Sequence, residues 1–112
     1  MDNTLDRYKT LVRDVILEHA THKPAHGNIT TRAVIDEEHD IYQVVDIGWQ
    51  GKRRVFGVIL HVDIIGNKIW IQYDGTEHGV AKALVEAGVP CESIVLGFKP
   101  EHVRPHTEFA VA

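Results

Sequence analysis

The sequence has little cysteine, no excess of positive charge and no long apolar run. Cys91 is the only cysteine among 112 residues, so the chain cannot form an internal disulfide, as is typical of cytoplasmic proteins. No apolar run approaches the ~18 residues of a membrane span, and the acidic start MDNTLDRYK lacks the apolar segment of a secretory signal. Twelve Lys and Arg against 16 Asp and Glu give a net charge of −4, which does not favour binding to DNA mainly through phosphates. We therefore expect a cytoplasmic protein with no membrane contact.

The chain has enough apolar residues to form one folded domain, which we place at residues 1–112. Hydrophobic residues make up 44% of the sequence, and single domains most often have about 100–150 residues. Helical spacing of apolar residues predicts an amphipathic helix over 3–20, with Asn3 at its start. Pro24 and Gly27 are expected to end it. The residues of its apolar face are Leu5, Tyr8, Leu11, Val12, Val15 and Ile16.

After residue 28 the apolar period changes from helical spacing to alternation, which is typical of strands. The connections between the expected strands are short, and short turns join antiparallel neighbours. The sequence therefore predicts an α+β fold: an N-terminal helix, a four-stranded antiparallel meander, a second helix and a short C-terminal strand with an irregular tail. The expected strands are 29–36, 41–49, 53–64 and 68–73.

Alternation also assigns the two faces of the expected sheet. The face expected to meet the helices carries Ile29, Thr31, Ala33, Ile35, Phe56, Val58, Leu60, Val62, Ile64, Ile69, Ile71 and Tyr73. The opposite face carries Arg32, Tyr42, Val44, Asp46, Ile59, His61, Asp63, Lys68, Trp70 and Gln72. This second face is too apolar to be left in water. We expect a partner chain, a second copy of the protein or the C-terminal segment to cover it.

The hexapeptide Asp74–Gly79 holds the greatest density of reactive side chains. Asp74 and Glu77 have the spacing of a capping box, in which each side chain accepts a hydrogen bond from a backbone N–H at a helix start. This interpretation leaves His78 without a structural task. A functional alternative is that the helix start holds an anion or a side chain of a partner.

A second candidate is the cluster of Lys52, Arg53 and Arg54 beside Trp49 at an expected hairpin. Basic groups next to an aromatic ring can contact phosphates and bases, or an acidic protein. The structural alternative, which we favour, is a solvated hairpin whose charges protect a sheet edge and whose tryptophan covers the core.

A third candidate is the pair His61 and Asp63, which alternation places side by side on the second face. The two side chains could be metal ligands, or a base with its orienting acid; Asp46 and Gln72 are the nearest candidates for further ligands. The alternative is a polar pair within an interface. Because the sequence has no nucleophile elbow, phosphate loop or dinucleotide fingerprint, we expect neither an enzyme nor a cofactor.

The run IGWQGKRRVFGVILHVDIIGNKIWIQYDGTEHGVAKALVEAGVP, followed by IVLGF, VRP and TEFAVA, resembles the XisI family of cyanobacterial controlling factors for excision of the fdxN element. The resemblance extends over essentially the whole chain and implies a small α+β domain. It also implies an accessory role beside the nuclease-like companion XisH in site-specific recombination during heterocyst development. It brings no catalytic residues.

The leading hypothesis is a non-enzymatic, homo-oligomeric accessory factor that binds an XisH-like protein, within a possible DNA or recombinase complex. The alternatives are a direct DNA-binding factor that uses Lys52, Arg53 and Arg54 and, more weakly, a metal-dependent hydrolase at His61 and Asp63. The candidate residues for binding a partner or nucleic acid are Trp49, Lys52, Arg53, Arg54, Asp63, Trp70, Gln72, Asp74, Glu77, His78 and Arg104.

Overall fold

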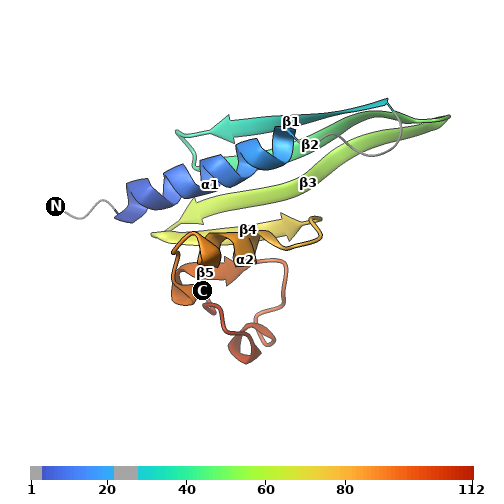
Figure 1. Cartoon of the computed structure of the whole chain (residues 1–112). Coiled ribbons are helices and arrows are strands. Elements are labelled where there is room, and N and C mark those ends of the chain that lie inside the picture. The colour runs from blue at the N-terminus through green and yellow to red at the C-terminus, as the bar shows by residue number, and fades with distance from the viewer. Residues whose placement is uncertain (1–3, 22–27) are drawn as a thin grey trace.

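A computed structural model describes residues 4–21 and 28–112 (Figure 1). Asn3, Pro24 and Gly27, which the sequence assigns to the start and the end of the first helix, lie outside the described residues. No helix among the described residues is long and apolar enough to span a membrane. The elements in chain order are α1 (Thr4–Thr21), β1 (Asn28–Asp36), β2 (Ile41–Gln50), β3 (Arg53–Ile65), β4 (Lys68–Asp74), α2 (Val80–Glu86), a 3-10 turn (Cys91–Ser93), β5 (Ile94–Leu96) and a second 3-10 turn (Arg104–His106).

The strands form one five-stranded sheet in the order β1-β2-β3-β4-β5. The first four strands are an antiparallel meander, as the short turns predict, and β5 adds to β4 in parallel after the crossover through α2. Asn67 adopts a φ of 65° in the turn between β3 and β4, the left-handed conformation that a tight hairpin requires. The predicted α+β fold is therefore confirmed.

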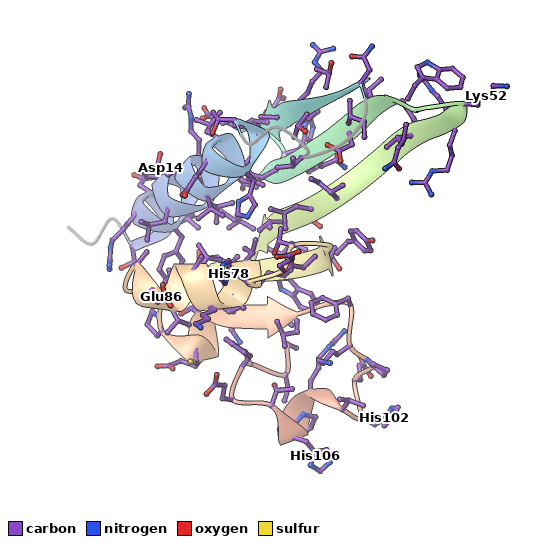
Figure 2. All side chains as sticks on the ribbon, turned by 45° about the vertical axis from the view of Figure 1, so that its right-hand side comes forward. Asp14, Lys52, His78, Glu86, His102 and His106 are labelled. Atoms are coloured by element: carbon purple, nitrogen blue, oxygen red, sulfur yellow. The ribbon has the colours of Figure 1, made fainter. Side chains whose placement is uncertain are left out.

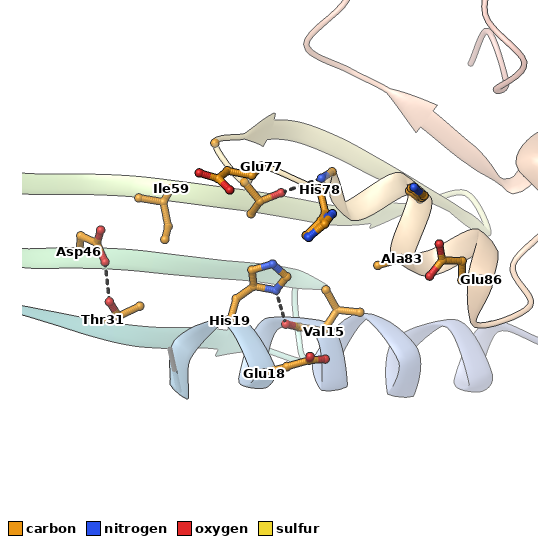
Figure 3. A pocket seen from close by; sticks show the side chains of 14 residues that line it. Val15, Glu18, His19, Thr31, Asp46, Ile59, Glu77, His78, Ala83 and Glu86 are labelled. Atoms are coloured by element: carbon orange, nitrogen blue, oxygen red, sulfur yellow. Dashed lines mark hydrogen bonds between the residues drawn. The ribbon is translucent and has the colours of Figure 1, made fainter. Parts of the chain in front are cut away.

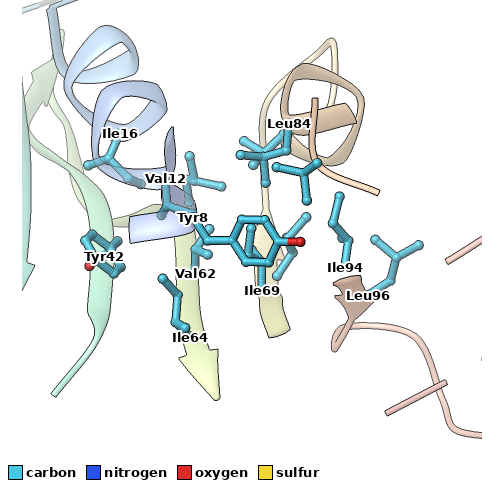
Figure 4. Close-up of a cluster of buried hydrophobic side chains, with 14 of the residues drawn as sticks. Tyr8, Val12, Ile16, Tyr42, Val62, Ile64, Ile69, Leu84, Ile94 and Leu96 are labelled. Atoms are coloured by element: carbon cyan, nitrogen blue, oxygen red, sulfur yellow. The ribbon is translucent and has the colours of Figure 1, made fainter. Parts of the chain in front are cut away.

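The core lies between one face of the sheet and the two helices (Figure 4). From α1, Tyr8, Val12 and Ile16 are buried, which is the predicted apolar stripe. From α2, Val80 and Leu84 are buried. The Tyr8 hydroxyl reaches across the core and donates a 2.9 Å hydrogen bond to Ser93 Oγ, and so ties α1 to the start of β5.

Two residues of β2 face the core, although we expected them on the opposite side. Tyr42 and Val44 are fully buried. They pair directly with Val62 and Leu60 of β3, and directly paired residues project from the same side of a sheet. The prediction was wrong because β2 is apolar at both alternating sets of positions, so its pattern does not reveal which set faces inward.

Three residues expected in the core lie on the outer face instead. Phe56, Val58 and Tyr73 are 70%, 38% and 53% exposed. Val44 pairs with Leu60 but Val45 pairs with Val58, which makes Ile59 an extra residue in β3. Such a β-bulge reverses the facing of all residues beyond it.

A second bulge lies one strand further along the sheet. His61 pairs with Tyr73, whereas Val62 pairs with Ile71, so Gln72 is the extra residue of β4. The bulge turns Tyr73 to the outer face. In β3, Ile59, expected on the outer face, packs against the core instead.

The C-terminal segment folds back onto the sheet and covers part of its outer face. The Ala110 N–H donates to the Ile94 carbonyl over 2.9 Å, and Ala110 forms a parallel bridge with Val95. Arg104 of the same segment lies over the Trp70 ring. The expected cover is therefore present at β4 and β5, while Phe56 and Val58 at the far end of the sheet stay exposed.

Candidate functional site

A chain of polar side chains crosses three strands on the outer face. His61 Nε2 lies 2.7 Å from Asp63 Oδ1, and His61 Nδ1 lies 2.8 Å from Gln43 Nε2. Gln72 Nε2 donates to Asp63 Oδ2 over 3.1 Å. The predicted pairing of His61 with Asp63 is therefore present, and both side chains are about four-fifths buried.

This network has the chemistry of a closed hydrogen-bond chain. Gln43 and Asp63 engage both imidazole nitrogens of His61, and both Asp63 carboxylate oxygens have partners. Among the described residues, no group of three His, Cys, Asp or Glu side chains converges as metal ligands do. Asp46, suggested as a further ligand, lies on the helix side of the sheet and accepts a 2.7 Å hydrogen bond from Thr31 Oγ1. The geometry thus favours a polar pair over a metal site.

The basic cluster is at the tip of the long β2–β3 hairpin, far from His78 (Figure 2). Lys52, Arg53 and Arg54 are all exposed. The Arg54 guanidinium lies 5.2 Å from the centroid of the Trp49 ring, and Arg53 donates a 2.7 Å hydrogen bond to Gln50 Oε1. Trp49 is exposed at the tip and does not cover the core. The tip is therefore a solvated surface of positive charge and one stacked indole.

The loop Asp74–Gly79 is a helix start, although not the predicted capping box. Asp74 Oδ2 accepts a 2.7 Å hydrogen bond from the Val80 N–H, and Asp74 Oδ1 accepts a 2.9 Å hydrogen bond from the Thr76 N–H. Asp74 thus accepts a hydrogen bond from the helix start, as expected, but from a residue six positions further along the chain. The separation is this long because α2 begins only after Gly79, which has a φ of 84°. Glu77 is exposed and makes no reciprocal hydrogen bond in the described part of the chain.

A cleft of about 930 Å³ opens between α1, the sheet and the start of α2 (Figure 3). The rings of His19 and His78 point toward one another across it. Among the described residues its lining is acidic: four carboxylate side chains line the cleft, against Lys82 as the one lysine or arginine. These carboxylates are Glu18, Asp46, Glu77 and Glu86.

A second, mainly apolar groove of about 590 Å³ lies on the other side of α2, against the C-terminal segment. Val85 of α2 and Phe98 after β5 are exposed there, beside Phe109. Its charged lining is mostly acidic: Asp74, Glu86 and Glu108 against Lys82. This surface suits apolar side chains flanked by positive charge.

Arg104 holds the C-terminal segment in place. Its guanidinium lies 5.3 Å from the centroid of the Trp70 ring. Its Nε donates to the Lys99 carbonyl over 3.0 Å, and its terminal nitrogens reach the carbonyls of Gly97 and Val111. Both Arg104 and Trp70 are thus engaged in structural contacts.

The predicted site residues form four separate groups, one of which is the contact between Arg104 and Trp70. Asp63 and Gln72 belong to the outer network, the basic residues to the hairpin tip, and Asp74, Glu77 and His78 to the loop between the two hollows. The sequence did not indicate Gln43 or Phe98. Gln43 joins the network because β2 pairs it with His61, and this pairing follows only from the register.

Comparisons with known proteins agree with this architecture. The family model described as "XisI protein" matches residues 1–111. A crystal structure of a XisI-like protein from Anabaena variabilis ATCC 29413 is 34% identical, with a TM-score of 0.89, over 96% of this chain and 99% of that one. The fdxN element excision controlling factor XisI from the same organism is 33% identical, with a TM-score of 0.84, over 98% of this chain and 100% of that one. The curated proteins contain no match. The protein described above belongs to the XisI family.

Proposed function

We propose that this protein is a non-enzymatic accessory factor that controls a site-specific DNA rearrangement by binding a nuclease-like protein of the XisH type. One observation carries the proposal: the match to the excision controlling factor XisI covers 98% of this chain and 100% of that one. The charged and polar side chains of the outer network and of the helix start already form hydrogen bonds within the fold. Their engagement supports a role in binding rather than in catalysis.

The groove between α2 and the C-terminal segment is our proposed contact surface for this partner. Val85 and Phe98 offer exposed apolar surface, and Glu86 and Glu108 add negative charge beside it. Interfaces are anchored by a few apolar side chains in such hollows. The partner would contribute apolar residues next to lysine or arginine.

Co-expression with an XisH-type protein tests the proposal. With a tag on the companion only, the two chains should elute together at mild salt, and Phe98→Ala should weaken the complex at least about tenfold. Ile65→Ala is a matched control, because Ile65 is exposed to a similar extent but lies in β3, outside the lining of the groove. Separate elution of the wild-type chains would overturn the proposal.

Direct DNA binding by the hairpin tip is the second candidate, favoured by the exposure of its three basic residues and the Arg54–Trp49 stacking. Three phosphate contacts would make the logarithm of affinity fall with the logarithm of salt concentration with a slope of about −3. A gel shift at low salt that disappears with Arg53→Ala/Arg54→Ala would support this candidate, and no shift of any duplex at low salt would exclude it.

A further inference from the structure

The outer half of β3 has an unpaired edge. β3 runs from Arg53 to Ile65, but its pairing with β4 extends only from Leu60, opposite Asp74, to Ile65 (Figure 1). The Gly75 N–H then donates to the Ile59 carbonyl over 2.8 Å and ends the contact. No described strand pairs with the 53–58 edge on that side. Six residues of strand give about 20 Å of open backbone.

This edge carries exposed apolar side chains, and its charged residues, Arg53 and Arg54, lie at the end next to the hairpin tip. Phe56 and Val58 lie on the outer face beside Tyr73, and Phe56 is the most exposed large hydrophobic side chain of the described residues. Proteins usually block such an edge with charges, proline or a covering segment. Here the Arg54 guanidinium lies over the Phe56 ring, 5.8 Å from its centroid, but no proline or covering segment among the described residues blocks the backbone from Val55 to Val58. The backbone of the edge is therefore open to another strand.

We infer that a second copy of this chain occupies the edge, with the two β3 strands antiparallel across a two-fold axis at Val55. The axis places Arg54 opposite Phe56 and Arg53 opposite Gly57 of the other copy. Each tip therefore ends before Gly75, which occupies the edge at Ile59. An isologous contact of this kind satisfies both edges at once and closes the assembly at two chains. The two five-stranded sheets then form one continuous sheet.

Charge complementarity selects a second copy over an unrelated strand. In the antiparallel arrangement, the tip of one copy lies beside the Gly75–Gly79 loop of the other, where β4 ends. Arg53 pairs with Gln50 and lies on the helix side of the sheet, the side on which the acidic cleft opens. Arg53 and Lys52 thus approach Glu77 and Asp46 of the other copy, and each basic tip completes an acidic cleft.

The contact area is consistent with a dimer of modest affinity. Aromatic side chains bury about 150–250 Å² each when fully covered, and Phe56, Tyr73 and Val58 are 70%, 53% and 38% exposed. Their remaining exposed area is therefore well below the ~800 Å² per partner that stable complexes bury. The contact between the tip and the cleft adds to this area. We therefore expect dissociation on dilution.

Light scattering after size exclusion, over a series of concentrations, tests the inference. At high concentration the wild-type mass should approach twice the 12.6 kDa of the chain. Phe56→Lys should raise the dissociation constant at least about thirtyfold, while Ile65→Lys, an equally apolar exposed site at the paired end of the same strand, should leave it unchanged.

A charge exchange tests the arrangement itself. Arg53→Glu and Glu77→Arg should each weaken the dimer, and the double variant should restore it, because the pair forms between copies. A wild-type monomer at every concentration would overturn the inference. So would a dimer that persists in Phe56→Lys. Neither result would bear on the XisH-type complex, which uses the groove beside α2.

Discussion

The Arg104 guanidinium lies over the Trp70 ring, 5.3 Å from its centroid, and joins the C-terminal segment to the outer face of the sheet. Arg104 also donates to the carbonyls of Lys99, Gly97 and Val111. A single side chain therefore fixes both ends of a segment that has little regular structure. This segment also forms one wall of the apolar groove.

We predict that Arg104→Ala lowers the free energy of unfolding by about 2 kcal/mol, because hydrogen bonds from a charged donor and a cation–π contact are lost together. Urea unfolding followed by circular dichroism measures this. His106→Ala, in the same 3-10 turn but exposed, should change the free energy by less than about 0.5 kcal/mol. Equal effects of the two substitutions would show that Arg104 does not hold the segment.

Asp74→Ala should lower the free energy of unfolding by about 1–2 kcal/mol, because the Val80 and Thr76 amides lose their acceptor. Glu77→Gln should be neutral at a chain concentration too low for self-association, since the exposed Glu77 makes no capping hydrogen bond in the described structure. Thermal unfolding of both variants separates the observed cap from a capping box. In a capping box both substitutions would destabilise the protein.

Val44→Ala should lower the free energy of unfolding by about 2 kcal/mol, because the Val44 side chain is fully buried on the helix side of the sheet. Val58→Ala, on the outer face beyond the bulge, should cost less than about 1 kcal/mol when unfolding is measured at a chain concentration too low for self-association. A larger loss of stability in Val58→Ala than in Val44→Ala would mean that Val58 faces the core and that β3 has no bulge at Ile59.

Tyr42→Phe should leave the stability at neutral pH unchanged within about 1 kcal/mol, because the buried Tyr42 hydroxyl has no hydrogen-bond partner in the described residues. Burial raises the pKa of Tyr42 above its ordinary value of 10.0, helped by Asp40 and Glu37. A raised folded pKa gives stability that is complete below pH 10 and is lost as the pH rises through the folded value.

The phenylalanine variant should therefore lose less stability than the wild type above pH 10. Tyr73→Phe is the matched control, because Tyr73 is exposed and its removal should not alter the alkaline limb. Unfolding in urea at a series of alkaline pH values makes the comparison. Identical alkaline limbs for wild type and Tyr42→Phe would contradict the prediction.

The sequence predicted the elements well and the faces of the sheet less well, for one physical reason. Apolar residues alternate without a break from Phe56 to Ile64, yet the side that faces the core changes at Ile59. A bulge is set by the pairing of two strands and leaves no mark in the pattern of one strand.

In the candidate site too, the sequence predicts contacts within one strand but not contacts between strands. His61 and Asp63 were found because they are two residues apart on one strand, where alternation is sufficient. Gln43 was not found, because its contact with His61 depends on the register between β2 and β3. The hydrogen bond from the Val80 N–H to Asp74 could not be predicted either, because it depends on the conformation of the loop around Gly79.

Titration calorimetry of this chain with an XisH-type protein at physiological salt tests most directly whether the protein acts by binding such a partner. We predict saturable binding with a dissociation constant of about 1 μM or tighter, which corresponds to about −8 kcal/mol. Affinity should fall in Phe98→Ala but not in Ile65→Ala. No saturable binding by the wild-type chain at concentrations well above this value would contradict it.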